Sequence, residues 1–154
     1  MANIYTIIVT YNGSAWIRKC LDTLLQSTVN TSIIVIDNAS ADDTCSVISK
    51  DYPHVCVTKL SFNIGFGRAN NIGIKIAYDA GATHFFLLNQ DACVEPDTIE
   101  KLVIQEEQNP QFGIISPMHL NGSGEGLDAN FALYINPAGC ADLFSDLCLN
   151  RALD

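Results

Sequence analysis

The sequence predicts an α/β fold in which helices cover both faces of a mostly parallel β-sheet. Runs rich in β-branched and apolar residues alternate with segments of helical periodicity from residue 4 to residue 116. The strand-like runs are almost wholly apolar, as expected for strands buried on both faces of a parallel sheet. With 48% hydrophobic and 16% charged residues among 154, the chain has the composition of a core-forming domain.

In the first part of the chain, two buried strands enclose one helix. Residues 4–10 (IYTIIVT) and 32–37 (SIIVID) are mostly apolar, β-branched runs. Between them, residues 14–26 place apolar side chains three and four positions apart, which predicts an amphipathic helix. Ser40 and Asp43 then have the spacing of a capping box, which predicts the start of a second helix.

The alternation continues through the middle of the chain. Residues 54–59 form a shorter third strand, and a helix is expected from Gly67 to Gly81. Residues 83–88 (THFFLL) predict a fourth strand, and Pro96 suits the first turn of the helix that follows.

The pattern changes towards the C-terminus. We expect a fifth strand at residues 113–116 (GIIS), a further strand at 131–135 and a helix at 141–153. The change of pattern suggests that residues 1–118 form one half and residues 119–154 the start of a second.

Charge and cysteine usage exclude several classes of protein. The net charge is −9, and the 8 Lys and Arg residues are scattered, so we expect no nucleic-acid partner. None of the 6 cysteines forms a Cys-x-x-Cys pair, which argues against structural zinc.

No apolar run approaches the roughly 20 residues of a transmembrane helix, and no signal peptide is evident. We therefore expect reduced thiols and a cytoplasmic location.

Polar residues and glycines gather where the predicted strands end. Because ligands bind beyond the carboxyl ends of parallel strands, we expect a ligand site there. The residues that follow the first four strands are Thr10, Tyr11, Asn12 and Gly13; Asp37, Asn38 and Ser40; Asn63, Gly65 and Gly67; and Asn89, Gln90 and Asp91.

Each of these residues also has a purely structural interpretation. Asp37 either caps a turn or accepts hydrogen bonds from a base or ribose. Tyr11 packs internally or stacks on a nucleobase, and Gly65 permits a tight turn or the approach of a phosphate to a helix N-terminus. Arg68 is either solvated or bound to a phosphate. Asp91 caps a turn or holds Mg²⁺ or Mn²⁺ together with substrate phosphates.

Other nucleotide-binding classes fit less well. There is no Walker A motif, which argues against a P-loop NTPase. The glycines follow the third strand rather than the first, and Asn70 stands where a dinucleotide-binding motif has its third glycine. The glycine-rich loop with a basic residue that a nucleotidylyltransferase needs after the first strand is also missing.

Taken together, the motifs resemble the donor-binding half of a family 2 glycosyltransferase with the GT-A fold. The resemblance covers about residues 4–118. The matching strings are IIVTYNG at 7–13, IIVIDNAS at 33–40, the Asn- and Gly-rich run at 63–73, and FLLNQDA at 86–92.

The resemblance implies that a sugar passes from a nucleoside-diphosphate sugar to a glycan or lipid-linked acceptor with inversion, in bacterial cell-surface polysaccharide biosynthesis. Asp91 matches the last carboxylate of the family's Asp-x-Asp metal motif for Mg²⁺ or Mn²⁺, while Asn89 replaces the first. The NQD form resembles rhamnosyltransferase-like members and implies a dTDP-rhamnose donor. By the same resemblance, the nucleotide-binding residues are Thr10, Tyr11, Asn12, Asp37, Asn38, Asn63, Gly65, Gly67, Asn71, Asn89 and Asp91.

The resemblance leaves the catalytic base unassigned. The family's base lies in the second half, where Asp128 is the only acid in a suitable loop, and its surroundings do not match. Since the chain ends near the middle of the family's plan, we expect a fragment that binds donor but transfers sugar poorly or not at all. The alternative is a non-catalytic nucleotide- or sugar-binding module. An open sheet edge would favour homo-oligomers, and the resemblance places the protein at the inner face of the membrane.

Overall fold

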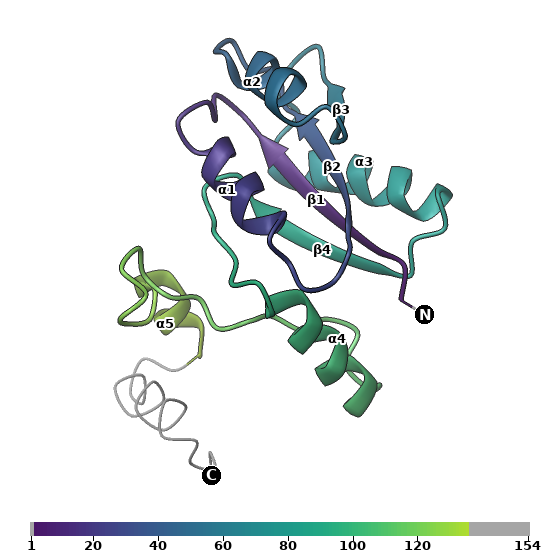
Figure 1. Ribbon diagram of the computed structural model, residues 1–154, viewed down its shortest axis with the longest axis vertical. Coiled ribbons are helices and arrows are strands. Elements are labelled where there is room, and N and C mark those ends of the chain that lie inside the picture. Colours follow the sequence, from purple (N-terminus) through teal and green to yellow (C-terminus); the bar gives the residue numbers. More distant parts are fainter. Residues whose placement is uncertain (1, 136–154) are drawn as a thin grey trace. The chain divides into compact units, whose positions relative to one another are not determined.

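The computed structural model describes residues 2–135, and the chain divides into two compact units, Met1–Phe112 and Gly113–Asp154. The first unit is an α/β layer structure (Figure 1). Its elements, in chain order, are β1 (Ile4–Thr10), α1 (Ile17–Leu24), β2 (Ser32–Asp37), α2 (Thr44–Asp51), β3 (Cys56–Lys59), α3 (Phe66–Asp79), β4 (His84–Asn89) and α4 (Thr98–Gln108).

The sheet has four parallel strands in the order β3-β2-β1-β4. Val9 of β1 is in register with Ile36 of β2 and with Asn89 of β4, so the strands end at one edge of the sheet. The chain first winds outward from β1 to β3 and then returns to the other side of β1 with β4. This reversal creates a switch point beside the carboxyl end of β1, where ligands bind in open α/β sheets. The predicted fold class is confirmed.

Two separate apolar clusters cover the two faces of the sheet. On one face, Ile8 and Val35 pack with Leu21 of α1, Ile48 of α2 and Ile99 of α4. On the other face, α3 is the helix within residues 2–135 that packs on the sheet, and α1 and α3 lie on opposite sides of it in Figure 1. The side chains in that second cluster include Ile7, Val9, Ile34, Ile36, Ala69 and Ala77.

Helix α3 approaches the sheet closely because Gly73 has no side chain. A Cβ atom at this position would lie 2.5 Å from Cγ2 of Ile7 and 3.3 Å from Cγ1 of Ile36. Both isoleucines are fully buried, with 0% of each side chain exposed. Gly73 therefore fixes how near α3, and the loop before it, come to β1 and β2.

The second unit differs from the sequence expectation. Residues 131–135, expected as a strand, belong to α5 (Ala129–Ile135). The reason is a helix cap: the carboxylate of Asp128 accepts hydrogen bonds from the backbone N–H groups of Asn130 and Phe131. The ring of Phe131 also stacks on His119 at a centroid distance of 4.6 Å.

Two further local predictions are wrong, namely the strand at 113–116 and the capping box of Ser40 and Asp43. The helix expected at 141–153 lies outside the described residues. Residues 113–116 form no strand, because no segment in the described part of the chain pairs with them, and Ile114 is 92% exposed. The capping box of Ser40 and Asp43 is also not formed. The Oγ of Ser40 instead accepts a hydrogen bond from the backbone N–H of Asn12.

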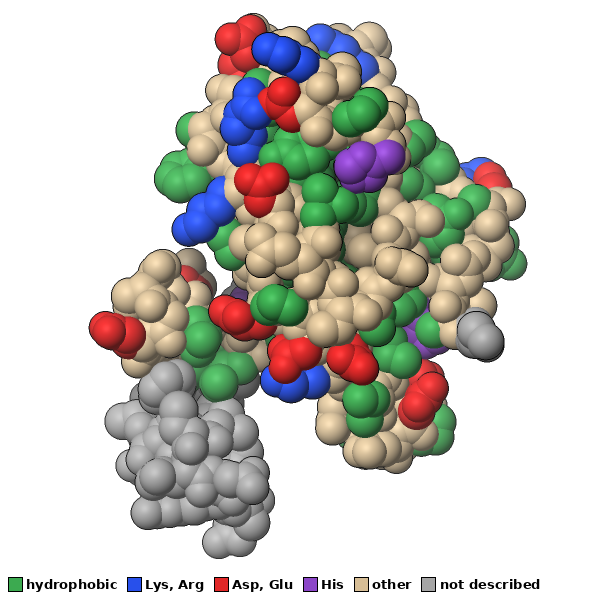
Figure 2. Space-filling view, in the orientation of Figure 1, with side chains coloured by type: hydrophobic (Ala, Val, Ile, Leu, Met, Phe, Trp, Pro, Cys, Tyr) green, Lys and Arg blue, Asp and Glu red, His purple; other side chains and the backbone are tan. Residues whose placement is uncertain are grey.

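One face of the first unit is mixed in charge, and the edge strand β4 is partly apolar. On the face drawn in Figure 2, Lys and Arg side chains lie among Asp and Glu side chains. At the β4 edge, Phe85 and Leu87 are 37% and 49% exposed, since α3 packs mainly over β1 and β2. Self-association through this edge stays a prediction. Within residues 2–135, none of the helices has the length and apolar character needed to cross a membrane.

The close packing of α3 is tested by Gly73→Ala, with Gly67→Ala as the matched control. The new methyl group at position 73 meets the buried side chain of Ile7, whereas position 67 has open space around it. We expect Gly73→Ala to lower the free energy of unfolding by about 1–2 kcal/mol, net of alanine's higher helix propensity. Gly67→Ala should leave it unchanged or raise it by up to ~1 kcal/mol. Urea denaturation measures both, and equal stability of the two variants would contradict the packing argument.

Candidate functional site

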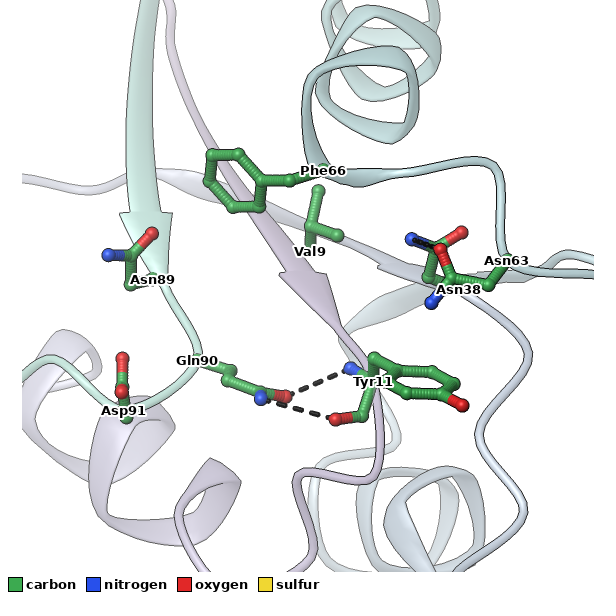
Figure 3. A pocket seen from close by; sticks show the side chains of 8 residues that line it. All are labelled: Val9, Tyr11, Asn38, Asn63, Phe66, Asn89, Gln90 and Asp91. Atoms are coloured by element: carbon green, nitrogen blue, oxygen red, sulfur yellow. Dashed lines mark hydrogen bonds between the residues drawn. The ribbon is translucent and has the colours of Figure 1, made fainter.

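A cavity of about 330 Å³ lies at the carboxyl ends of the strands (Figure 3). Its size falls at the lower end of the range for small-molecule sites, roughly 300–1,000 Å³. Amide side chains dominate its lining, together with two aromatic rings and one carboxylate. The lining residues are Val9, Tyr11, Asn38, Asn63, Phe66, Asn89, Gln90 and Asp91.

The amide of Gln90 joins the end of β4 to the loop after β1. Its Oε1 accepts hydrogen bonds from the hydroxyl of Thr10 at 2.6 Å and from the backbone N–H of Tyr11 at 3.0 Å. Its Nε2 donates to the carbonyl oxygen of Tyr11 at 3.3 Å. A side chain at Gly13 would occupy the same space, since a Cβ there would lie 2.1 Å from Oε1. Gln90 therefore fixes Tyr11 relative to β4.

A second amide pair joins β2 to the loop before α3. The Nδ2 of Asn38 donates to Oδ1 of Asn63 at 2.9 Å, and Oδ1 of Asn38 accepts the N–H of Ile64 at 2.9 Å. Oδ1 of Asn63 also accepts the N–H of Gly65, which has a φ of 88° that favours glycine. Asn63 is also one of the residues that line the cavity.

The loops after β1 and β2 are tied together by Asp42. Its Oδ2 accepts the N–H of Ser14, and its Oδ1 accepts both the N–H and the hydroxyl of Thr44. The Thr44 hydroxyl in turn accepts the N–H of Gly13. Desolvation alone would raise the pKa of Asp42, but the hydrogen bonds from Thr44 and Ser14 outweigh it and hold the pKa below its usual value.

Asp37 lies behind the cavity rather than in its lining. Its side chain is fully buried, and Oδ2 accepts the N–H of Ser40 at 3.1 Å. Its Oδ1 has no hydrogen-bond partner among the described residues. Burial first, and then hydrogen bonding and charge from the Asp37 carboxylate, raise the pKa of Cys45 to about 11, so this thiol is neutral. The neutral thiol is a weak donor beside the carboxylate, so Asp37 is not left without an interaction on that side.

Asp91 and Asn89 are the groups suited to a divalent cation. Both side chains are exposed in the cavity, and neither forms a hydrogen bond or ion pair with the described residues. The described part of the chain holds no group of three or more His, Cys, Asp or Glu able to bind a metal. One carboxylate with one amide oxygen fits Mg²⁺ or Mn²⁺ only where phosphates and water supply the remaining ligands.

The predicted site residues divide into three groups. Tyr11, Asn38, Asn63, Asn89 and Asp91 line the cavity together. Thr10, Asn12 and Asp37 lie in the supporting hydrogen-bond network, where Asn12 accepts the N–H of Ala41. Gly65, Gly67 and Asn71 are exposed on the loop and first turns of α3, outside the lining.

The residues assigned to nucleotide binding did not include three that line the cavity, namely Val9, Phe66 and Gln90, although Gln90 was expected at this edge of the sheet. In the sequence, Gln90 could have been assigned to the site because it stands between Asn89 and Asp91. Phe66 could have been assigned because it lies within the glycine-rich run at 63–73.

Comparison with known proteins gives the class. The sequence profile of glycosyl transferase family 2 matches residues 5–127. The chain belongs to this family. A dTDP-rhamnosyl transferase of Shigella flexneri is 33% identical over 66% of this chain and 33% of its own length. An N-acetylglucosaminyl-diphospho-decaprenol L-rhamnosyltransferase of Mycobacterium tuberculosis is 27% identical over 73% of this chain and 39% of its own. The chain thus spans about a third of the length of these relatives.

Solved structures of proteins in complex with nucleotide sugars share the fold. S. aureus TarS in complex with UDP-GlcNAc aligns with a TM-score of 0.62 at 18% identity, over 77% of this chain and 38% of TarS 1-349. A mannosyltransferase of Pyrobaculum calidifontis in complex with GDP-Man and Mn²⁺ aligns with a TM-score of 0.57 at 23% identity, over 66% and 31%. The GT-A-like α/β fold implied by the sequence is confirmed.

The loop network around Asp42 is tested by Asp42→Asn, with Asp43→Asn as the control. Asparagine offers one acceptor oxygen in place of two, whereas the side chain of Asp43 makes no capping hydrogen bond. Because Asp42 is exposed and screened by solvent, we expect a loss of only about 0.5–1 kcal/mol in the free energy of unfolding at pH 7, and a smaller change for Asp43→Asn.

The loss of unfolding free energy caused by Asp42→Asn should become smaller as the pH falls. The folded-state pKa of Asp42 lies below the unfolded value of about 3.9. Its contribution is therefore present above about pH 4 and is lost as the pH falls through the folded pKa. Denaturation of wild type and Asp42→Asn at descending pH should show the difference shrinking in acid. A difference that grows in acid would contradict this assignment.

Proposed function

We propose that this chain forms the donor-binding part of an inverting glycosyltransferase that takes a sugar from a nucleoside-diphosphate sugar. The observation that carries the proposal is the cavity itself, where amide groups, an unpaired carboxylate and two aromatic rings converge at the switch point of the sheet. Membership of the family and the shared fold of nucleotide-sugar complexes support it.

The two ends of the cavity suit the two ends of a nucleoside diphosphate. In Figure 3 the ring of Tyr11 lies on the same side as Asn38 and Asn63, while Asn89 and Asp91 lie on the other. An aromatic face with neighbouring amides suits a nucleobase, which needs stacking and hydrogen bonds. The end that holds Asp91 suits the diphosphate, because Asp91 would hold a divalent cation whose positive charge would favour the binding of phosphate groups.

In the transfer of a sugar from a nucleoside-diphosphate sugar, negative charge develops on the leaving diphosphate, and the site has to stabilise this charge. A divalent cation bound there supplies positive charge against the leaving group. Asp91 and Asn89 are the residues of this chain that would hold it. The Gln90 amide keeps the neighbouring β1 loop in place through its hydrogen bonds with Tyr11.

We propose dTDP-rhamnose as the donor, a glycan or lipid-linked molecule as the acceptor, and bacterial cell-surface polysaccharide synthesis as the setting. The named rhamnosyl transferases among the relatives support this choice. A location in the cytoplasm, at the inner face of the membrane, remains a prediction from the resemblance.

One observation favours the second candidate, a binding module without catalysis by this chain alone. Within the described residues, Asp91 is the only acidic side chain that lines the cavity. If Asp91 holds a cation, it is not available to take the proton of the acceptor hydroxyl. Asp128, in the second unit, caps α5 by accepting the N–H groups of Asn130 and Phe131, and we assign it no role as a base.

Calorimetric titration of the 154-residue chain with UDP, GDP and dTDP, each with and without Mn²⁺, tests the proposal. We expect dTDP to bind with Mn²⁺, and Asp91→Asn to weaken that binding about tenfold or more while changing the metal-free affinity less than about twofold. Because the chain supplies few metal ligands, Mn²⁺ alone should bind weakly. Glu95→Gln, an exposed acid outside the lining, is the matched control.

The outcomes separate the two candidate functions. Absence of binding by any nucleotide to a chain that shows a cooperative thermal transition would overturn the donor-site proposal. Binding without sugar transfer to any acceptor favours the module or an enzyme that needs further chain, as we expect. Measurable transfer by this chain would refute the expectation that it is inactive alone.

A further inference from the structure

Phe66 is an aromatic side chain that the hydrophobic core does not use. It is the first residue of α3, yet 56% of it is exposed. The contacts between α3 and the sheet are made by other residues, among them Ala69 and Ala77, with Ile64 packing from the loop before the helix. The ring instead lines the cavity above Val9, where it forms an apolar wall in a mostly polar site.

The backbone before α3 holds this ring in place. Gly65 precedes the helix with a φ of 88°, and its N–H is bound by Oδ1 of Asn63. The amide pair of Asn38 and Asn63 fixes that loop to β2. Phe66 is thus presented to the cavity by a hydrogen-bonded loop, even though its own side chain is left exposed.

The two aromatic rings of the cavity serve different ends. In Figure 3 the ring of Phe66 points towards Asn89, whereas the ring of Tyr11 points away from it, towards the side of Asn38. With the base at Tyr11 and the diphosphate at Asp91, the group attached to the diphosphate would lie on the side of Asn89, and the ring of Phe66 points to that side.

We propose that Phe66 is a specificity-determining residue that packs against the sugar of the donor, an inference that rests on the proposed function. A pyranose ring presents C–H groups on its face, and a 6-deoxyhexose adds a methyl group at C6. Both gain from contact with an aromatic face that is otherwise exposed to water. Phe66 lets the site distinguish a nucleotide sugar from the free nucleoside diphosphate, and favours sugars with an apolar C6.

Paired titrations test this contact. Dissociation constants are measured with Mn²⁺ for dTDP against dTDP-rhamnose, and for UDP against UDP-glucose, on wild type, Phe66→Ala and Phe66→Leu. We expect the nucleotide sugar to bind more tightly than its diphosphate in wild type. Phe66→Ala should weaken the nucleotide sugar about fivefold and the diphosphate less than twofold, with Phe66→Leu in between.

The control is Phe62→Ala, which removes a ring that is 67% exposed on the same loop but outside the cavity lining. It should change neither affinity. Equal weakening of diphosphate and nucleotide sugar by Phe66→Ala, or no effect on either, overturns the sugar contact while leaving the proposed function intact. A wild-type chain that binds no nucleotide overturns the proposed function itself, and this inference with it.

Discussion

The backbone N–H groups beyond the carboxyl end of β1 impose the constraint on which the rest of this site depends. Where the ladder stops, these groups have no strand to donate to. The N–H of Gly13 is buried, and a buried donor without an acceptor costs about 1–3 kcal/mol. Side chains from other segments accept all of them. The pairs are Tyr11 with Gln90, Asn12 with Ser40, Gly13 with Thr44 and Ser14 with Asp42. The loops after β1, β2 and β4 are therefore ordered together, as one hydrogen-bonded rim.

This constraint decides which polar groups are left for a ligand. Within the rim, hydrogen bonds are accepted by the side-chain oxygens of Ser40, Asp42 and Thr44. These three residues support the site and do not line the cavity. Asn89 and Asp91 have no such task among the described residues, and their side chains stay exposed at the cavity. We therefore assign binding of the cation and the diphosphate to Asn89 and Asp91, whose side chains make no hydrogen bonds within the rim.

Close packing on the other face of the sheet gives the cavity its remaining wall. Because Gly73 lets α3 lie directly on Ile7 and Ile36, the start of that helix reaches the end of β1. The rim also holds Ala39 at a φ of 68°, a conformation that costs a non-glycine residue on the order of 1–3 kcal/mol. Such a conformation persists only where the surrounding hydrogen bonds fix it, which agrees with a rim ordered for binding.

The sequence by itself determined the parallel α/β sheet and the rim that carries the polar residues, because buried strands and amphipathic helices are local patterns read over a few residues. The strands predicted at 113–116 and 131–135 do not form. A strand exists only with a partner, and residues 113–116 have none in the described part of the chain. Residues 131–135 belong instead to the helix that Asp128 caps. Only the tertiary structure decided that Asn12 and Asp42 support the rim while Phe66 and Gln90 line the cavity. The deciding contacts join residues as far apart in the chain as Thr10 and Gln90, which lie 80 positions apart, and no periodicity along the sequence encodes such a pairing.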